Sequence, residues 1–246
     1  MIFGAIVAGG TGTRMKIDGA VSFKASLPDI PKQFLPIKDK PIIYYSIKKF
    51  LEVSKIDRVI VGVHKDYYDY MNEIIDAHFY NRKDDILVVI GGNDRNRTLM
   101  NMIDAINSKF GSYDDDIIVT HDAVRPFVTA KMIEENISLA MKYGAVDTAY
   151  STTDTVVISE NGEYIEAVPN RASLYNGQTP QSFNMKKLKQ LYSSLTDEQK
   201  LTLTDACKIF TLNNEKVYLA KGDAINMKIT AKSDYFTALA LAEYLL

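Results

Sequence analysis

The chain has 246 residues, of which 46% are hydrophobic and 24% are charged. That is the composition of a globular protein with enough chain to bury a sizeable core. The formal net charge of -2 gives no electrostatic reason to expect nucleic acid or a membrane surface as a partner. A single cysteine, Cys207, excludes an internal disulfide, and no spacing of Cys and His residues resembles a zinc site.

The apolar start of the chain, "MIFGAIVA", is more typical of a buried strand than of a targeting signal. It lacks a basic segment and runs into glycines after a few residues. No run approaches the roughly 18 consecutive apolar residues of a membrane helix. We therefore expect a cytoplasmic protein with no membrane partner.

Short β-rich runs recur along the chain, with amphipathic segments between them. The runs are "IFGAIVA", "DRVIVGV", "DILVVIGG", "DIIVTHD" and "AVDTAYS". This alternation predicts an α/β fold, a Rossmann-like and mostly parallel sheet with helices on both faces. We expect a single domain over residues 1–246.

Two intervening segments have helical periodicity. The segment after Arg97 places on one stripe Leu99, Met102, Ile103, Ile106 and Phe110. The segment after Thr129, a predicted N-cap, does the same with Ile133, Ile137, Ala140 and Met141. Both stripes are predicted to be core. A last helix is expected in "SDYFTALALAEYLL", capped by Ser233.

The stretch "TDTVVISENGEYIEAVPNR" breaks this rhythm. It places β-branched runs on either side of Asn161-Gly162, a strong hairpin turn signal. A hairpin inserted into an α/β sheet is an appendage, and we predict a β-arm at about 152–172. Such an arm either reaches a partner subunit or lies as a flap on the protein's own surface.

The first strand leads into a glycine loop, "AGGTGTRM". A dinucleotide-binding turn needs a third glycine where Met15 stands, and an acidic residue at the end of the second strand, which is missing. A Walker loop fails too, because no Gly-Lys-Ser/Thr follows. What remains is either a plain tight turn or a run of small residues whose N–H groups approach phosphates or a base edge, ending in Arg14.

Two further motifs favour phosphate binding. In "PKQFLPI", Pro31 and Pro36 restrain the backbone that carries Lys32 and Gln33. In "VTHDAVRPF", Asp122 stands at the carboxyl end of a predicted strand, where a carboxylate could hold Mg2+ against a triphosphate. His121 is expected to be a packed neighbour and not a ligand.

The motifs in chain order are "AGGTGTRM", "PKQF", "GGNDRNRT", "HDAVRP", "PNRASLYNGQTPQSF", "TDACKIF" and "NMKIT". Together they resemble those of the cytidylyltransferases that activate polyol phosphates, over nearly the whole chain. The resemblance implies CTP as the nucleotide, a polyol phosphate as the acceptor and Mg2+ as the cofactor. It also implies a homodimer formed through the β-arm.

The same resemblance implies roles for individual residues. Arg14 and Lys32 would stabilise the transition state, Arg171 and Lys228 would position the polyol phosphate, and Asp122 would hold the magnesium. The acceptor site would also include Arg125, Thr155, Arg171 and Thr204. The residues expected to contact CTP are Val7, Ala8, Gly9, Gly10, Gly92, Asn93, Asp94, Arg95, Asn96, Arg97 and Thr98.

Two positions bear on the acceptor. Members of the family that act on 2-C-methyl-D-erythritol 4-phosphate typically have acidic residues where this chain has Ala206 and Ile225. The sequence therefore favours D-ribitol 5-phosphate, for teichoic acid or surface polysaccharide synthesis, with the erythritol phosphate as the alternative. A non-catalytic nucleotide sensor is a third hypothesis, but it would be expected to lose Lys32, Asp122 or Arg171. The loop over 16–31 departs from the family by being longer, and whether Lys16 or Lys24 adds a phosphate contact is left open.

Overall fold

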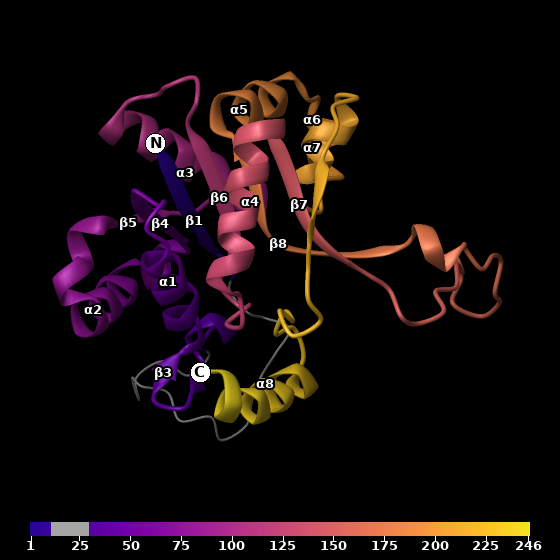
Figure 1. Ribbon diagram of the computed structural model, residues 1–246, viewed down its shortest axis with the longest axis horizontal. Helices are drawn as coiled ribbons and strands as arrows, with labels where there is room; N and C mark the ends of the chain where they lie inside the picture. The colour runs from indigo at the N-terminus through magenta and orange to yellow at the C-terminus, as the bar shows by residue number, and fades with distance from the viewer. Residues whose placement is uncertain (11–29) are drawn as a thin grey trace.

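The computed structural model describes residues 1–10 and 30–246. In this part of the chain a seven-stranded sheet has the order β5-β4-β1-β6-β8-β7-β9 (Figure 1). Only β8 runs antiparallel to its neighbours. The predicted, mostly parallel α/β sheet is confirmed. Its strands are β1 (Ile2–Ala8), β4 (Arg58–Val63), β5 (Ile86–Ile90), β6 (Ile117–Asp122), β7 (Ala145–Ser151), β8 (Tyr175–Asn184) and β9 (Tyr218–Lys221).

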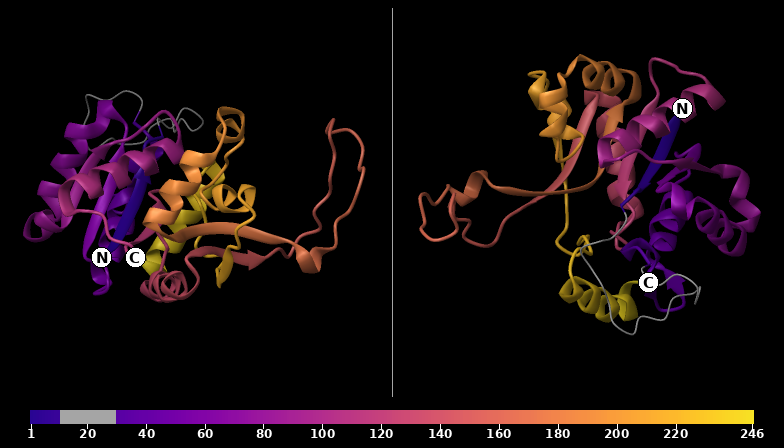
Figure 2. Two further views of the ribbon diagram at one scale, coloured as in Figure 1. Left: turned by 90° about the horizontal axis from the view of Figure 1, so that it is seen from above. Right: turned by 180° about the vertical axis from the view of Figure 1, so that it is seen from behind.

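The central strand β1 is apolar on both of its faces because helices cover both sides of the sheet (Figure 2). Phe3 and Ala5 belong to one buried cluster, and Ile6 and Ala8 belong to the other. On the side of Ile6 lie α1 (Ile42–Glu52), α2 (Tyr68–His78) and α4 (Ala130–Tyr143). On the side of Phe3 lie α3 (Arg95–Phe110), α5 (Met185–Ser194) and α7 (Cys207–Leu212).

A third apolar cluster joins the C-terminal helix α8 (Lys232–Leu245) to the chain near Lys32. It contains Leu35 and Tyr235, and the hydroxyl of Tyr235 donates to the carbonyl of Pro36. The remaining short elements are β2 (Pro36–Ile37), β3 (Lys40–Pro41), α6 (Asp197–Leu201) and the 3-10 turns Lys32–Phe34, Lys65–Tyr67, Tyr80–Asp85 and Arg171–Ser173. Within the described ranges, none of the helices combines the length and the apolar character needed to span a membrane.

Two details of the predicted helices are wrong. Met141 is 68% exposed, because α4 turns it away from the sheet and buries Met132 instead. Helix α8 is not capped by Ser233, which lies inside it; the helix begins at Lys232, after Ala231. The carboxylate of Asp234 accepts the N–H groups of Thr230 and Ala231 at 2.7 and 2.8 Å, so an acidic side chain serves this helix end.

The predicted arm projects from the sheet between β7 and β8 (Figures 1 and 2). Its turn is confirmed: Gly162 has a φ of 76°, and Asn161 Oδ1 accepts the N–H of Glu163 at 2.9 Å. The flanking runs do not form regular strands, since one isolated bridge joins Ile158 and Ala167. Nearly all side chains of the arm are exposed, so packing does not impose a continuous strand pairing.

Candidate active site

Parallel pairing brings the carboxyl ends of neighbouring strands to one edge of the sheet. β1 and β6 are in register from Ile2 with Ile117 to Val7 with Asp122, and the loop after β5 reaches the same edge. A cavity of about 360 Å³ opens there, where open α/β sheets bind ligands. Its lining is Val7, Ala8, Gly9, Gly10, Lys32, Gln33, Gly92, Asn93, Asp94, Arg95, Thr98, Asp122, Ala123, Val124 and Lys228.

This lining unites residues from five of the motifs singled out in the sequence. The glycine loop, the lysine turn, the loop after β5 and the end of β6 all contribute, together with Lys228 near the C-terminus. Gln33, Ala123 and Val124 also line the cavity, although they were not among the site residues predicted from the sequence. They stand inside the "PKQF" and "HDAV" motifs, but nothing in their residue type or spacing distinguishes them from exposed neighbours.

Asp122 is the electrostatic centre of the cavity. Its carboxylate is 3.0 Å from Arg95 Nε, 2.8 Å from Lys228 Nζ and 3.8 Å from Arg125 Nε. Burial alone would raise the pKa of Asp122, but Arg95 and Lys228 outweigh it and hold the pKa well below its ordinary value. Asp122 is therefore a permanent anion among three cations.

His121 is part of the support behind Asp122. Thr179 Oγ1 accepts the N–H of Asp122 at 3.1 Å, which leaves its hydroxyl to donate to His121 Nδ1 at 3.0 Å. His121 Nε2 then donates to the carbonyl of Arg125 at 3.1 Å. Burial lowers the pKa of His121 to about 4, so the ring is neutral, and its expected role as a packed neighbour agrees with this geometry.

The loop after β5 is shaped by the first turn of α3. Asp94 caps the helix by accepting the N–H of Arg97 at 2.8 Å, and Thr98 Oγ1 accepts the N–H of Gly92 at 3.0 Å. A Cβ at Gly92 would lie 2.3 Å from the Arg97 side chain, so only glycine fits here. Gly92, Asn93 and Asp94, which this turn holds in place, all line the cavity.

Several predicted site residues lie elsewhere. Thr155 and Arg171 are exposed on the arm, where Arg171 Nη1 donates to the carbonyl of Thr153 at 3.2 Å. Thr204 precedes α7 and does not line the cavity, and neither do Asn96 and Arg97. The predicted catalytic residue Arg14, with Lys16 and Lys24, lies outside the described residues.

Arg125 is buried beside the cavity, at 8% exposure, and does not line it. Its Nη1 donates to the carbonyl of Asn226 at 2.7 Å, and Asn226 Nδ2 donates to the carbonyl of Thr179 at 2.8 Å. These bonds fix the loop that leads to Lys228. In this chain alone, Arg125 supports the cavity wall from behind.

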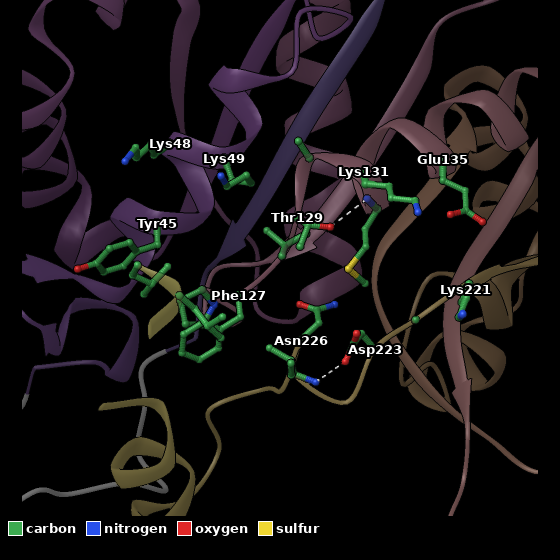
Figure 3. Close-up of a pocket in the computed structure, with 18 residues that line it drawn as sticks. Tyr45, Lys48, Lys49, Phe127, Thr129, Lys131, Glu135, Lys221, Asp223 and Asn226 are labelled. Carbon is green, nitrogen blue, oxygen red and sulfur yellow. Dashed lines mark hydrogen bonds between the residues drawn. The ribbon is translucent and has the colours of Figure 1, made fainter. Parts of the chain in front are cut away.

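A larger cavity of about 500 Å³ lies between α1, the start of α4 and the loop after β9 (Figure 3). It is lined by lysines, including Lys48, Lys49, Lys131 and Lys221, around apolar residues such as Phe127. Lys48 and Lys49 approach Glu52 at 4.0 and 2.6 Å. None of the predicted site residues that the structure describes lines this cavity, so the smaller one is the candidate active site.

A second acidic residue, the partly buried Asp147, lies on β7. It accepts a hydrogen bond from Gln181 Nε2 at 3.0 Å and another from the Cys207 thiol. Burial raises the pKa of Asp147 to about 6, with a contribution from the neighbouring Asp205. Burial and Asp147 also raise the pKa of Cys207, which is consistent with an unreactive thiol.

The described part of the site offers few side chains that could bind a metal ion. Among the residues that the structure describes, no three His, Cys, Asp or Glu side chains gather as a metal cage. Magnesium is usually held by one or two carboxylates together with substrate phosphates. Asp122 fits that mode, as one carboxylate facing a cavity that a triphosphate could fill.

Comparison with known proteins identifies the family. Residues 2–246 match the family model described as "IspD: 2-C-methyl-D-erythritol 4-phosphate cytidylyltransferase". The chain belongs to this cytidylyltransferase family. The sequence-based identification and the prediction of a CTP-dependent nucleotidyltransferase are thereby confirmed.

Relatives within the family differ in the substrate they are named for. Ribitol-5-phosphate cytidylyltransferase of Streptococcus pneumoniae serotype 2 (strain D39 / NCTC 7466) is 45% identical over 243 residues, which cover 99% of each chain. The solved 4-diphosphocytidyl-2C-methyl-D-erythritol synthase of Anaerococcus prevotii DSM 20548 superposes with a TM-score of 0.76 at 27% identity, covering 98% of each chain. The 2-C-methyl-D-erythritol 4-phosphate cytidylyltransferase of Thermus thermophilus, at 21% identity and a TM-score of 0.74, shares the fold over 99% of this chain and 100% of that one.

Proposed function

We propose that this cytidylyltransferase transfers the cytidylyl group of CTP to D-ribitol 5-phosphate, giving CDP-ribitol and pyrophosphate. The observation that carries the proposal is the 45% identity, over 99% of both chains, to an enzyme named for ribitol 5-phosphate. Ala206 and Ile225, which replace the acidic residues typical of the erythritol enzymes, support it. The product would serve teichoic acid or surface polysaccharide synthesis, and the expected cytoplasmic location remains a prediction.

The backbone of the cavity suits a pyrimidine nucleotide. Val7 to Gly10 line the cavity from the end of β1, and Gly92 to Asp94 line it from the loop after β5. Peptide N–H and C=O groups of these two segments, where they contact the base, can match the donors and acceptors of a cytosine edge, and the larger ring system of a purine would clash with the same positions. We expect CTP to be preferred over ATP and GTP.

The reaction needs positioning and charge, and no protein nucleophile. A phosphate oxygen of the acceptor attacks the α-phosphorus of CTP, the bond to the β-phosphate oxygen breaks, and pyrophosphate leaves with the electron pair. Lys32 and Lys228 lie on the cavity wall, where their charges would stabilise the growing negative charge. Arg14 would add a further cation from its own loop.

Mg2+ is the cofactor we propose, held by Asp122 together with the triphosphate of CTP. When bound, the ion would neutralise part of the phosphate charge. Asp122 keeps its negative charge at all physiological pH values, which supports this role. Lys228 already touches the same carboxylate, so it would share the position between Asp122 and the phosphates.

The acceptor site is incomplete in one chain. Arg171 and Thr155, the residues that the family resemblance assigns to the acceptor, lie on an arm that projects away from the sheet (Figure 1). We propose a homodimer in which each arm supplies these residues to the cavity of the other subunit. Exposed apolar residues on the arm support the presence of a partner, among them Val157, Ile158, Tyr164 and Ile165.

The test is an assay of the purified enzyme with CTP, Mg2+ and each polyol phosphate, with product identified by mass. We expect CDP-ribitol from ribitol 5-phosphate and a kcat/KM at least tenfold lower with 2-C-methyl-D-erythritol 4-phosphate. A higher kcat/KM for the erythritol phosphate would favour the alternative enzyme. CTP binding without turnover of either acceptor would favour the nucleotide sensor.

A further inference from the structure

Gln33 is a buried polar residue that lines the nucleotide cavity. It lies in the 3-10 turn Lys32–Phe34, between Lys32 and the fully buried Phe34, and is 3% exposed. A buried amide must find hydrogen-bond partners, because leaving its donors unpaired would cost free energy. The acceptors of its two N–H groups therefore show which part of the structure Gln33 holds in place.

Both N–H groups of Gln33 point at the glycine loop. Nε2 is 2.9 Å from the carbonyl oxygen of Ala8 and 2.8 Å from that of Gly10. The amide nitrogen has two hydrogens, and the two carbonyls accept one each. On another side of the loop, a Cβ at Gly9 would lie 2.9 Å from Thr98 Oγ1, so the chain has little room to move there either.

These bonds fix more than two carbonyls. A peptide unit is planar and trans, so the direction of its C=O sets the direction of its N–H. Holding the carbonyl of Ala8 towards Gln33 turns the N–H of Gly9 to the opposite side. The orientation of the loop's backbone donors thus depends on a side chain 23 to 25 residues further along the chain.

The turn that carries Gln33 is itself anchored from behind. The ring of Phe34 is fully buried, with its centroid 5.5 Å from that of Tyr67 and 5.2 Å from that of Tyr70. Lys32 precedes Gln33 directly, so Lys32 and, through the Gln33 amide, the glycine loop are both attached to this turn. A shift of the turn relative to the loop would misplace the lysine against a bound nucleotide.

We infer that Gln33 is a positioning residue, which fixes Lys32 relative to the backbone of Ala8 to Gly10 before the nucleotide binds. The inference deepens the proposed function and rests on it for the role of Lys32. Near-attack geometry is sensitive to small displacements of a charged group, so loss of the amide should affect the chemical step as well as binding.

The test compares Gln33→Met and Gln33→Glu with the wild-type enzyme. Methionine keeps the volume and has no donor, while a glutamate carboxylate would face two carbonyl oxygens with no hydrogen to donate. We expect kcat to fall tenfold or more in both variants and KM for CTP to rise. In the absence of CTP, backbone hydrogen exchange over residues 3–10 should be faster than in the wild type.

The matched control is Gln199→Met, which removes another side-chain amide. Gln199 belongs to the capping box of α6, outside the cavity, so its loss should leave kcat and KM unchanged. If both Gln33 variants keep kcat and KM within twofold of wild type, the inference is wrong. A lower Tm with unchanged kcat and KM would make Gln33 a purely structural residue and would also overturn it.

The proposed function can fail separately. If the wild-type enzyme made no CDP-ribitol, the positioning role of Gln33 would still be testable. The measurements would be CTP affinity by calorimetry and hydrogen exchange of the glycine loop. Weaker CTP binding and faster exchange in both variants would support that role, and wild-type values for both would refute it.

Discussion

At the scale of single residues, Asp122 shows that the charges at the site are unbalanced before any substrate binds. One carboxylate lies against Arg95, Arg125 and Lys228, so the cavity has an excess of positive charge around a permanent anion. Removing one partner of a buried charge group leaves the others uncompensated, which is costly. A triphosphate would restore the balance.

Replacing Asp122 with asparagine should therefore separate stability from catalysis. We expect kcat to fall by on the order of 10²-fold and the free protein to melt at a lower temperature. In EDTA, CTP should raise the Tm of the variant by more than it raises the Tm of the wild type, because three cations have lost their counter-charge. Asp114→Asn, which removes an exposed partner of Lys186, is the control. Full activity of the Asp122 variant would contradict both the magnesium role and this charge balance.

Asp147 is a residue whose burial opposes its own ionisation. Its pKa rises from 3.8 to about 6 in the fold, so folding favours the protonated form. This contribution to stability is complete below about pH 4 and is lost as the pH rises through about 6. The wild-type protein is accordingly less stable at pH 8 than it would be with a neutral group at this position.

The variant Asp147→Asn should reveal this loss. Asparagine keeps an acceptor for Gln181 and Cys207 and carries no charge. Denaturant unfolding should show the variant to be about 3 kcal/mol more stable than the wild type at pH 8, and the difference should shrink towards zero near pH 4. A difference that did not depend on pH would show that packing, and not ionisation, dominates at this site.

At the scale of elements, α4 shows how sequence signals set the ends of a helix. Thr129 Oγ1 accepts the N–H of Met132 at 3.2 Å, and Gly144 ends the helix in the left-handed region with a φ of 82°. A Cβ at Gly144 would meet nothing within 4 Å, so the cost of alanine there is backbone strain alone. The predicted N-cap is confirmed.

Thr129→Ala and Gly144→Ala should each lower the free energy of unfolding by about 1 kcal/mol. The two ends of the helix share no partners, so the double variant should lose about 2 kcal/mol. Ser138→Ala, on the exposed middle of the same helix, should change stability by a few tenths of a kcal/mol at most. Denaturant titrations of the wild type and the four variants check this. A double variant with a free energy of unfolding no lower than that of either single variant would contradict it.

The strands differ in how well the sequence predicts them. The five apolar runs were placed to within about a residue or two, because buried parallel strands need continuous apolar sequence. β8 was not predicted, since its buried residues include Gln178, Thr179 and Gln181. Such side chains are stable inside only through long-range partners, for example the hydroxyl of Thr148 on the carbonyl of Pro180, and a local pattern contains no information about those.

The residues of the candidate site also differ in how well the sequence predicts them. Glycine loops and charged residues that follow strands could be predicted, because strand order brings them to one edge of the sheet. The role of Gln33 could not be predicted from the sequence. A glutamine between two prolines looks the same whether its side chain is exposed or donates hydrogen bonds to a loop more than 20 residues away. The arm was predicted from its turn, but its irregular backbone depends on the lack of packing around it.

At the scale of the whole molecule, the predicted site residues are divided between the edge of the sheet and the projecting arm. Lys32, Asp122 and Lys228 line one cavity at the edge of the sheet, while Arg171 belongs to the segment between β7 and β8. That segment projects from the body of the protein (Figure 2). The arm has one isolated bridge and many exposed apolar side chains, which is little support for a fixed position in water. A second subunit would supply that support and, by two-fold symmetry, would receive an arm in exchange.

Mixing two inactive variants tests this exchange directly. Lys32→Ala and Arg171→Ala should each be inactive alone, because every site lacks one of the two cations. After subunit exchange, about half of the dimers are hybrids, and each hybrid has one site lacking both cations and one intact site, so about one quarter of wild-type activity should return. Native mass spectrometry of differently tagged subunits would measure the exchange. If hybrids form and no activity returns, each site takes both residues from one chain, and the shared site is wrong even where cytidylyl transfer itself is intact.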